Sequence, residues 1–300
     1  MSRDGQFEAF GPQLSGVSFT PRVSPDGRYV AFGIGAQGER EVLVHDVLRG
    51  ATNRLTQEGT GSSPAWHPNG RELAVRTSTE SGEGIVLKDL NGAERSLVPG
   101  GDGLIRRNAS WSSDGQFFAY TVQDGSQHDI WVLPTGDDTS PRALLDGAAA
   151  EHSPQFSPNG RWLAYVSNES GRREVYVRSY PQGERLPVST DGGQGPVWSS
   201  DGEELFFQGF YEGANSLMVV SVTAEGETLR LGTPTQLFNL RVPGPTGAIV
   251  QYGGSNNAGP GFDIFPDGQR FVMSRGPDRR VGEIVIVTNW FEEFERPEPN

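Results

Sequence analysis

The sequence contains no cysteine and no long apolar run, and each absence excludes a class of protein. Without cysteine there are no disulfides, thiolate metal ligands or cysteine nucleophiles. No apolar run approaches the ~20 residues of a membrane span, so we predict no membrane insertion within this chain. The first residues, MSRDGQFEAF, lack the apolar core of a signal peptide. As written, the chain would be cytoplasmic.

Positive charge is scarce. The chain has 25 Lys and Arg against 38 Asp and Glu, a formal net charge of −13. Binding to nucleic acid needs clustered cations that neutralise phosphates, so we predict no nucleic-acid partner. The same charge argues against anionic membrane surfaces. We interpret it as an acidic, solvated surface that keeps the protein soluble.

Catalytic motifs are missing as well. The four histidines, His45, His67, His128 and His152, fall in four different repeat units, and no H-E-x-x-H pair or EF-hand loop occurs. We therefore predict no metal and no cofactor. No G-x-S-x-G nucleophile elbow is present, and nothing singles out the two facing carboxylates of a glycosidase. We predict no catalytic residues and a non-enzymatic protein.

Glycine and proline, by contrast, are abundant, with 41 and 21 residues spread along the chain. Many belong to one turn written six times: VSPDGRYVAF, WHPNGRELAV, WSSDGQFFAY, FSPNGRWLAY, WSSDGEELFF and IFPDGQRFVM. From Gly27 to Gly268 the turn glycines are 43, 45, 45, 42 and 66 residues apart. A period in the low forties with four strand-like runs per unit is typical of a β-propeller blade.

We therefore predict an all-β fold, a six-bladed β-propeller of four-stranded antiparallel blades in one domain, residues 1–300. The aromatic before the turn should pack between neighbouring blades, and the proline two residues earlier should mark entry to the inner strand. The turn Asp and Asn residues are interpreted as structural. The predicted blades are residues 17–58, 59–100, 101–147, 148–191, 192–242, and 258–294 together with 6–10.

The last unit supplies only three strands, and an open ring would expose two sheet edges. The orphan run QFEAF, residues 6–10, should complete the last blade beside EIVIVTNW, with Trp290 and Phe291 packing at its edge. Closure removes the edges that drive association, so a monomer is expected.

These units resemble the TolB-like propeller repeat, an aromatic followed by Ser-Pro-Asp-Gly and a Leu-Ala-Phe-type strand. The similarity is greatest to the C-terminal propellers of bacterial serine/threonine protein kinases and related stand-alone proteins. It rests on FSPNGRWLAYVSNESGRREVYVRSYP, VSTDGG, LMVVSV, FPDGQRFVM and IVIVTNWFEE. The resemblance implies an extracytoplasmic sensor domain if the chain belongs to a longer, membrane-anchored parent, in which the ring could be seven-bladed.

Candidate binding residues lie in the loops that a propeller gathers on one face, between blades and between second and third strands. Arg106 and Arg107 could hold a carboxylate by bidentate hydrogen bonds, or they balance neighbouring acids. The long connection 243–261 is either a cover over the channel or an insertion without a role. The predicted ligand-binding set is Arg106, Arg107, Glu151, His152, Gln194, Tyr211, Tyr252 and Asn256.

The sequence thus favours a propeller that binds a protein, a peptide or a small ligand on this face, as a scaffold or sensor module with a protein or peptide partner. The alternative is a hydrolase or lyase acting on a peptide or carbohydrate at the channel mouth. A buried cluster of Glu151, His152 and a second carboxylate would favour that alternative. A third hypothesis is a structural assembly module, which a broad apolar patch on the outer strands would favour.

Overall fold

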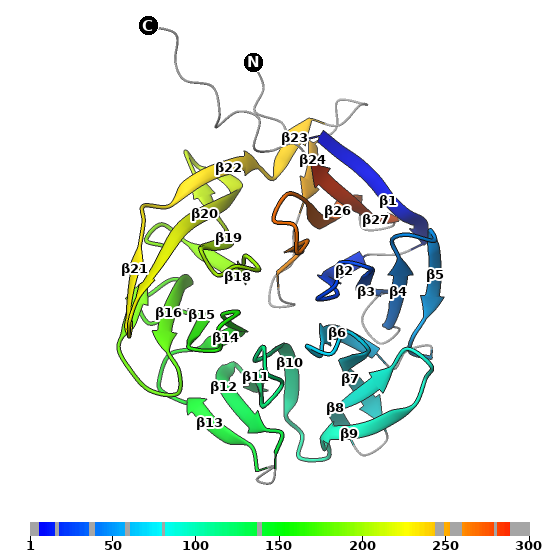
Figure 1. Ribbon diagram of the computed structural model, residues 1–300, viewed down its shortest axis with the longest axis horizontal. Coiled ribbons are helices and arrows are strands. Elements are labelled where there is room, and N and C mark those ends of the chain that lie inside the picture. Colours follow the sequence, from blue (N-terminus) through cyan, green and yellow to red (C-terminus); the bar gives the residue numbers. More distant parts are fainter. Residues whose placement is uncertain are drawn as a thin grey trace, which may run out of the picture.

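The computed structural model describes residues 6–15, 18–35, 40–57, 61–79, 82–136, 140–243, 249–252, 260–278 and 281–288. Within these ranges every regular element is a β-strand. The strands form antiparallel sheets arranged in a ring around a central axis (Figure 1). Each sheet runs from an inner strand at the axis to an outer strand at the rim.

Five blades are each built from consecutive strands of one stretch of chain. The first comprises β2 (Ser18–Val23), β3 (Tyr29–Ile34), β4 (Glu41–Asp46) and β5 (Ala51–Arg54). The second comprises β6 (Gly61–Trp66), β7 (Glu72–Thr79), β8 (Gly82–Asp89) and β9 (Glu94–Val98). The third comprises β10 (Ile105–Trp111), β11 (Phe117–Asp124), β12 (Gln127–Pro134) and β13 (Arg142–Leu145). The fourth comprises β14 (Glu151–Phe156), β15 (Trp162–Ser167), β16 (Glu174–Ser179) and β17 (Arg185–Pro187). The fifth comprises β18 (Gly193–Trp198), β19 (Glu204–Tyr211), β20 (Ala214–Glu225), β21 (Thr228–Leu231) and β22 (Thr235–Asn239).

The remaining sheet is composite, and it corrects the prediction of six four-stranded blades. It joins strands from both ends of the described chain: β1 (Gln6–Ser15), β23 (Arg241–Pro243), β24 (Ile249–Tyr252), β25 (Phe262–Ile264), β26 (Phe271–Asp278) and β27 (Val281–Thr288). The prediction of a six-bladed propeller is therefore wrong: only five blades are made of consecutive strands, and this six-stranded sheet closes the ring. The expected four-strand unit fails here because β23 and β24 come from what the sequence suggested was a loop.

Closure by the N-terminal strand is confirmed. β1 lies antiparallel beside β27 (Figure 1), with Gln6 opposite Thr288 and Phe10 opposite Ile284. Pairing the first described strand with the last removes two open edges and ties both ends of the chain into one sheet. Trp290 and Phe291 lie outside the described residues.

The core lies between blades, as the aromatic pattern predicted. Trp66 packs with Val42 and Val44 of the preceding blade, and its indole N–H donates to the carbonyl of Arg22 at 3.0 Å. Trp198 repeats this geometry, donating to Gln155 O at 3.1 Å. Each indole therefore combines apolar burial with a hydrogen bond that fixes the register between neighbouring blades.

The repeated turns carry a hydrogen-bond network that explains their sequence. The Ser157 hydroxyl donates to Asn159 Oδ1 at 2.8 Å and accepts the N–H of Trp162 at 3.0 Å. The N–H of Arg161 donates to the same Oδ1 at 3.0 Å. Three other turns repeat the two serine contacts: the hydroxyl donates to the Asp carboxylate two residues later and accepts the backbone N–H five residues later. The pairs are Ser24 with Asp26, Ser112 with Asp114, and Ser199 with Asp201. The Asx side chains thus satisfy the backbone of the turn, which agrees with their interpretation as structural.

A β-bulge interrupts the inner strand of each of the five blades built from consecutive strands. The bulge shows that the repeated proline does not mark entry to the inner strand, as the sequence predicted. Thr20, Ser63, Asn108, Ser153 and Gly195 have φ between 49° and 60°. In β14 the register shifts between His152 and Gln155. Pro154 follows the bulged residue, so the repeated proline lies inside the inner strand instead of at its entry. Bulges of this kind redirect neighbouring side chains, and these adjoin the loop face.

Candidate functional site

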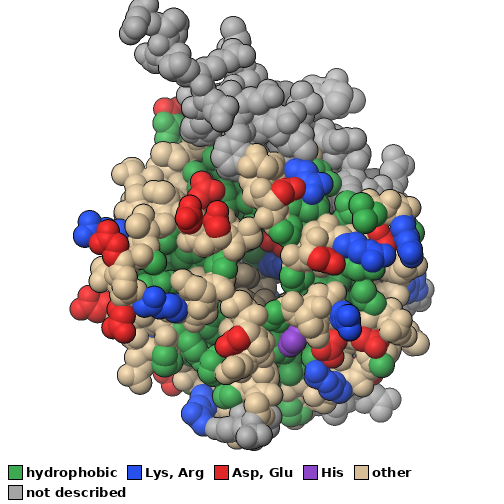
Figure 2. All heavy atoms as spheres, in the orientation of Figure 1, with side chains coloured by type: hydrophobic (Ala, Val, Ile, Leu, Met, Phe, Trp, Pro, Cys, Tyr) green, Lys and Arg blue, Asp and Glu red, His purple; other side chains and the backbone are tan. Residues whose placement is uncertain are grey.

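We call loop face the end of the ring that carries the inter-blade connections and the loops between second and third strands. The turn face is the opposite end, with the Ser-Asx turns. The view in Figure 2 shows a hollow at the centre of the ring and charged side chains of both signs dispersed around it. Most of the predicted site residues lie where inner strands begin, at the loop face.

Arg106 is a buried side chain that is hydrogen-bonded within the protein. Its side chain is 6% exposed. Its guanidinium donates to both carboxylate oxygens of Asp102 and to the carbonyl of Glu83 at 3.1 Å. The hydrogen bond from Arg106 is the main reason that the pKa of Asp102 is lowered. Of the two interpretations of this arginine, the contacts support the structural one.

Arg107, its neighbour in β10, has different surroundings. Its Nε is buried and has no hydrogen-bond partner among the described residues. Burial lowers its pKa, and the charges of Arg76 and Arg40 add to this effect. Glu83 opposes them, but Glu83 already receives two hydrogen bonds from Arg76. Arg107 is therefore a half-buried cation with other cations around it.

His152 lies close to His128 of the third blade, with ring centroids 6.0 Å apart. His152 is 7% exposed. Its Nδ1 contacts the Ser153 hydroxyl at 3.0 Å, whereas its Nε2 has no partner among the described residues. Burial lowers the pKa of His152 to about 3, and the charges of Arg173, His128 and Arg107 act in the same direction. His152 is therefore neutral at pH 7.

Glu151 precedes His152 but has other neighbours, because adjacent residues of a strand point to opposite faces. Its Oε1 accepts the Ser167 hydroxyl at 3.2 Å, and its Oε2 is buried without a partner in the described chain. Burial raises the pKa of Glu151 to about 7; Ser167 opposes this, while Asp129 and Glu169 add to it. A second carboxylate is thus near Glu151, but His152 does not share its contacts.

The other predicted residues are divided among several places. Gln194 in β18 donates to Gln208 Oε1 at 3.3 Å. Tyr211 is 43% exposed beside Phe210, 52% exposed, at the end of β19. Tyr252 lies in β24, where it pairs with Arg275. Asn256 lies outside the described residues, as do 244–248 and 253–259 of the long connection.

Sequence reasoning missed His128 and Arg173 as neighbours of His152. Both lie at the ends of loops between second and third strands, His128 in the preceding blade and Arg173 in the same blade as His152. The signal was present, since those loops share the face with the inter-blade connections. Their side-chain direction could not be read without the register of β12 and β16.

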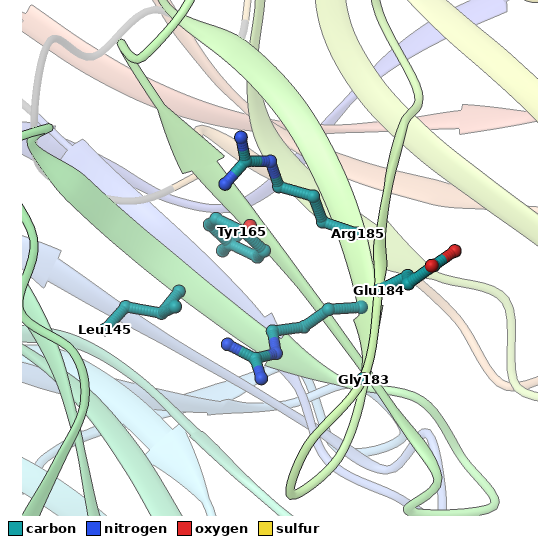
Figure 3. A pocket seen from close by; sticks show the side chains of 6 residues that line it. Leu145, Tyr165, Gly183, Glu184 and Arg185 are labelled. Atoms are coloured by element: carbon teal, nitrogen blue, oxygen red, sulfur yellow. The ribbon is translucent and has the colours of Figure 1, made fainter.

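A separate hollow of about 390 Å³ lies between the third and fourth blades at the rim. It is lined by Leu145, Tyr165, Arg178, Gly183, Glu184 and Arg185. In Figure 3 the ring of Tyr165 lies beside the Arg185 side chain, whereas Glu184 points away. Arg185 forms an ion pair with Glu169 at 2.8 Å, so the main charge here is already compensated.

Two features are absent from the part of the chain that the structure describes. No group of three or more His, Cys, Asp or Glu side chains is placed to hold a metal ion. None of its elements is a helix long and apolar enough to cross a membrane.

The sheets and their shared axis define a closed β-propeller. A family model for the TolB beta propeller domain matches residues 62–231, and the chain belongs to this family. A relative, the Protein TolB homolog of Chlorobium chlorochromatii (strain CaD3), is 33% identical over 104 residues. That alignment covers 35% of this chain and 23% of the relative, so the chain matches less than a quarter of that protein's length.

Solved structures extend the likeness to nearly the whole ring. TolB from Acinetobacter baumannii superposes with a TM-score of 0.57 at 16% identity, covering 90% of this chain and 63% of that one. An oligogalacturonate lyase in complex with manganese superposes with a TM-score of 0.63 at 11% identity, covering 99% and 100%. At such low identity these likenesses show the fold alone.

Proposed function

We propose that this protein is a non-enzymatic scaffold or sensor module that binds a protein or peptide partner on its loop face. The observation that carries the proposal is the exposed pair Phe210 and Tyr211, 52% and 43% exposed, at the end of the β19–β20 hairpin. Aromatic side chains of this kind are enriched at protein interfaces, because they bury a large area at little cost in side-chain entropy.

The position of the pair supports this assignment. A Cβ built on Gly192 would lie 3.1 Å from the Phe210 ring, so the aromatic pair borders the connection that leads into β18. Phe210 therefore lies beside the residue that precedes the inner strand of the fifth blade. Membership of the TolB family gives further support, since named relatives include Tol-Pal system proteins. An extracytoplasmic location, the alternative that the family resemblance implied, belongs to the same proposal.

Site-specific cross-linking tests the proposal. Phe210 is replaced by a photoreactive benzoylphenylalanine, and Leu48, 82% exposed in the loop between β4 and β5, is replaced in the matched control. In cells that naturally express the protein, irradiation should give a discrete adduct from position 210 that Tyr211→Ser abolishes. Equal adducts from both positions, or none from position 210, would contradict a binding role for this face.

The hydrolase or lyase alternative keeps one supporting observation, the buried Glu151 carboxyl with a pKa of about 7. Such a group can donate or accept a proton at neutral pH. If Glu151 were catalytic, Glu151→Gln would abolish turnover of a peptide or oligosaccharide substrate. We expect no turnover by the unmodified protein in such assays.

A further inference from the structure

Four basic side chains lie near one another at the loop face of the third and fourth blades. Arg107 comes from β10, His128 from β12 and His152 from β14, while Arg173 immediately precedes β16. The two imidazole rings are 6.0 Å apart at an interplanar angle of 61°. Burial lowers the pKa of both histidines, and the charges of Arg107 and Arg173 lower them further.

Three polar atoms of this cluster have no hydrogen-bond partner among the described residues. Arg107 Nε, His128 Nε2 and His152 Nε2 are all buried without a hydrogen bond among the described residues. More than nine in ten buried polar groups in folded proteins have a partner, and leaving one unpaired costs about 1–3 kcal/mol. Two of these atoms belong to neighbouring imidazole rings, and together with Arg107 Nε they can receive polar groups from a ligand.

The other ring nitrogens define what each free nitrogen offers. His128 Nδ1 lies 3.2 Å from the carbonyl of Ser126, so it carries the proton and leaves Nε2 as an acceptor in the neutral ring. Ser153 Oγ accepts from Asn108 Nδ2 at 3.3 Å, which leaves its hydroxyl to donate to His152 Nδ1. His152 Nε2 then carries the proton. The site presents two guanidinium groups, one N–H donor and one acceptor.

We propose that these four residues bind the C-terminal carboxylate of a peptide segment, with the guanidinium groups and His152 Nε2–H donating to the carboxylate. The last residue of a peptide also has an amide N–H beside its carboxylate, and this N–H matches the acceptor His128 Nε2. The inference rests on the proposed function, because it names the chemical group by which a protein partner enters the loop face.

Charge complementarity favours one carboxylate over a polyanion. The whole chain carries a formal net charge of −13, which repels nucleic acid and long acidic tails. At physiological ionic strength charges are screened beyond about 8 Å. A single carboxylate at the cluster is therefore attracted by the nearby arginines and repelled by Glu83 and Asp129, whose charges also act there. Guanidinium groups bind carboxylates through paired N–H donors.

Titration calorimetry with three peptide probes and with inorganic phosphate tests the proposal. The first is an acetylated tetra-alanine with a free C-terminus; the second is its C-terminal amide; the third is an amidated peptide with one internal glutamate. The free acid should bind at least tenfold more tightly than either amidated peptide. Equal binding of the glutamate peptide, or tighter binding of inorganic phosphate, would overturn the C-terminal assignment.

Variants separate the site from general electrostatics. Arg107→Gln and His152→Phe should each weaken binding of the free acid at least tenfold. Arg71→Gln, an exposed arginine in the second turn of the turn face, makes the same charge change and should leave binding unaltered. If Arg71→Gln weakens binding as much as Arg107→Gln, or if the free acid does not bind, the inference fails. A discrete adduct from position 210 would still support the proposed function.

Discussion

The two faces of the ring treat their polar groups in opposite ways. On the turn face, Ser112 and the N–H of Gln116 donate to Asp114, and these hydrogen bonds lower the pKa of that carboxyl. On the loop face, burial raises the pKa of Glu151 to about 7, and one of its oxygens has no partner in the described chain. The Asp114 turn is internally satisfied, whereas the proposed binding face keeps a buried group that costs stability.

Removing the closing strand β1 should have the largest effect on stability, because the ring that carries both faces would be opened. Deletion of residues 1–10 removes the β1 residues from Gln6 to Phe10 that pair with β27. Pairing and burial worth on the order of several kcal/mol would be lost. We therefore expect the melting temperature to fall by about ten degrees or more. Deletion of residues 1–5 alone is the control. An unchanged melting curve for the longer deletion would contradict closure by β1.

Gly160→Val tests the turn face specifically. Gly160 has φ of +68°, and a Cβ there would meet nothing within 4 Å, so the penalty is backbone strain alone. We expect a loss of about 1–3 kcal/mol in the free energy of unfolding, measured by urea denaturation. Gly147→Val adds the same side chain in open space at a glycine without positive φ and should cost little. Equal losses would mean that strain is not the cause.

Glu151→Gln tests the loop face through pH. A carboxyl whose pKa is raised from 4.5 to about 7 stabilises the fold below pH 4.5 and loses that stabilisation as the pH rises through 7. The amide avoids the charge. We therefore expect the variant to be more stable than the parent at pH 8, by on the order of 1 kcal/mol, and to show no gain at pH 4. A gain of the same size at both pH values would rule out the ionisation of Glu151 as its cause.

Asp114→Asn should give a smaller effect with the opposite pH signature. The pKa of Asp114 is lowered, so its ionised carboxylate stabilises the fold at pH values above the usual pKa range of Asp. This stabilisation is lost as the pH falls through the pKa of the folded state. Asn already occupies this turn position at Asn69 and Asn159, so the turn should persist. The variant should lose less stability than the parent between about pH 4 and pH 2. Identical acid unfolding curves would contradict a role for the Asp114 charge.

Much of this comparison was predictable from the repeat. The sixfold turn, the inter-blade aromatics and the closing run QFEAF follow from periodicity and from the energetic cost of open edges. The bulges did not, because Thr20, Ser63 and Asn108 adopt positive φ without the glycine that usually signals it. The composite sheet was missed because β24 lies in a Gly-rich connection that resembles a loop.

The candidate site was only half predictable for a related reason. Arg106 and Arg107 are indistinguishable in sequence, but consecutive strand residues point to opposite faces. One therefore meets Asp102, and the other joins His128, His152 and Arg173. Their proximity depends on how four strands from two blades align at the loop face, which no local pattern encodes.

The most direct test of the difference between the faces is the free energy of unfolding of Arg106→Gln and Arg107→Gln, measured side by side. Arg106→Gln should lose about 1.5–3 kcal/mol, because it removes charge-assisted hydrogen bonds of a buried side chain. Arg107→Gln should be as stable as the parent or more stable, because it removes a half-buried cation that lies among other cations and whose Nε has no partner among the described residues. Equal losses in the two variants would contradict the account, since Arg107 would then be structural and the loop face would hold no group reserved for a ligand.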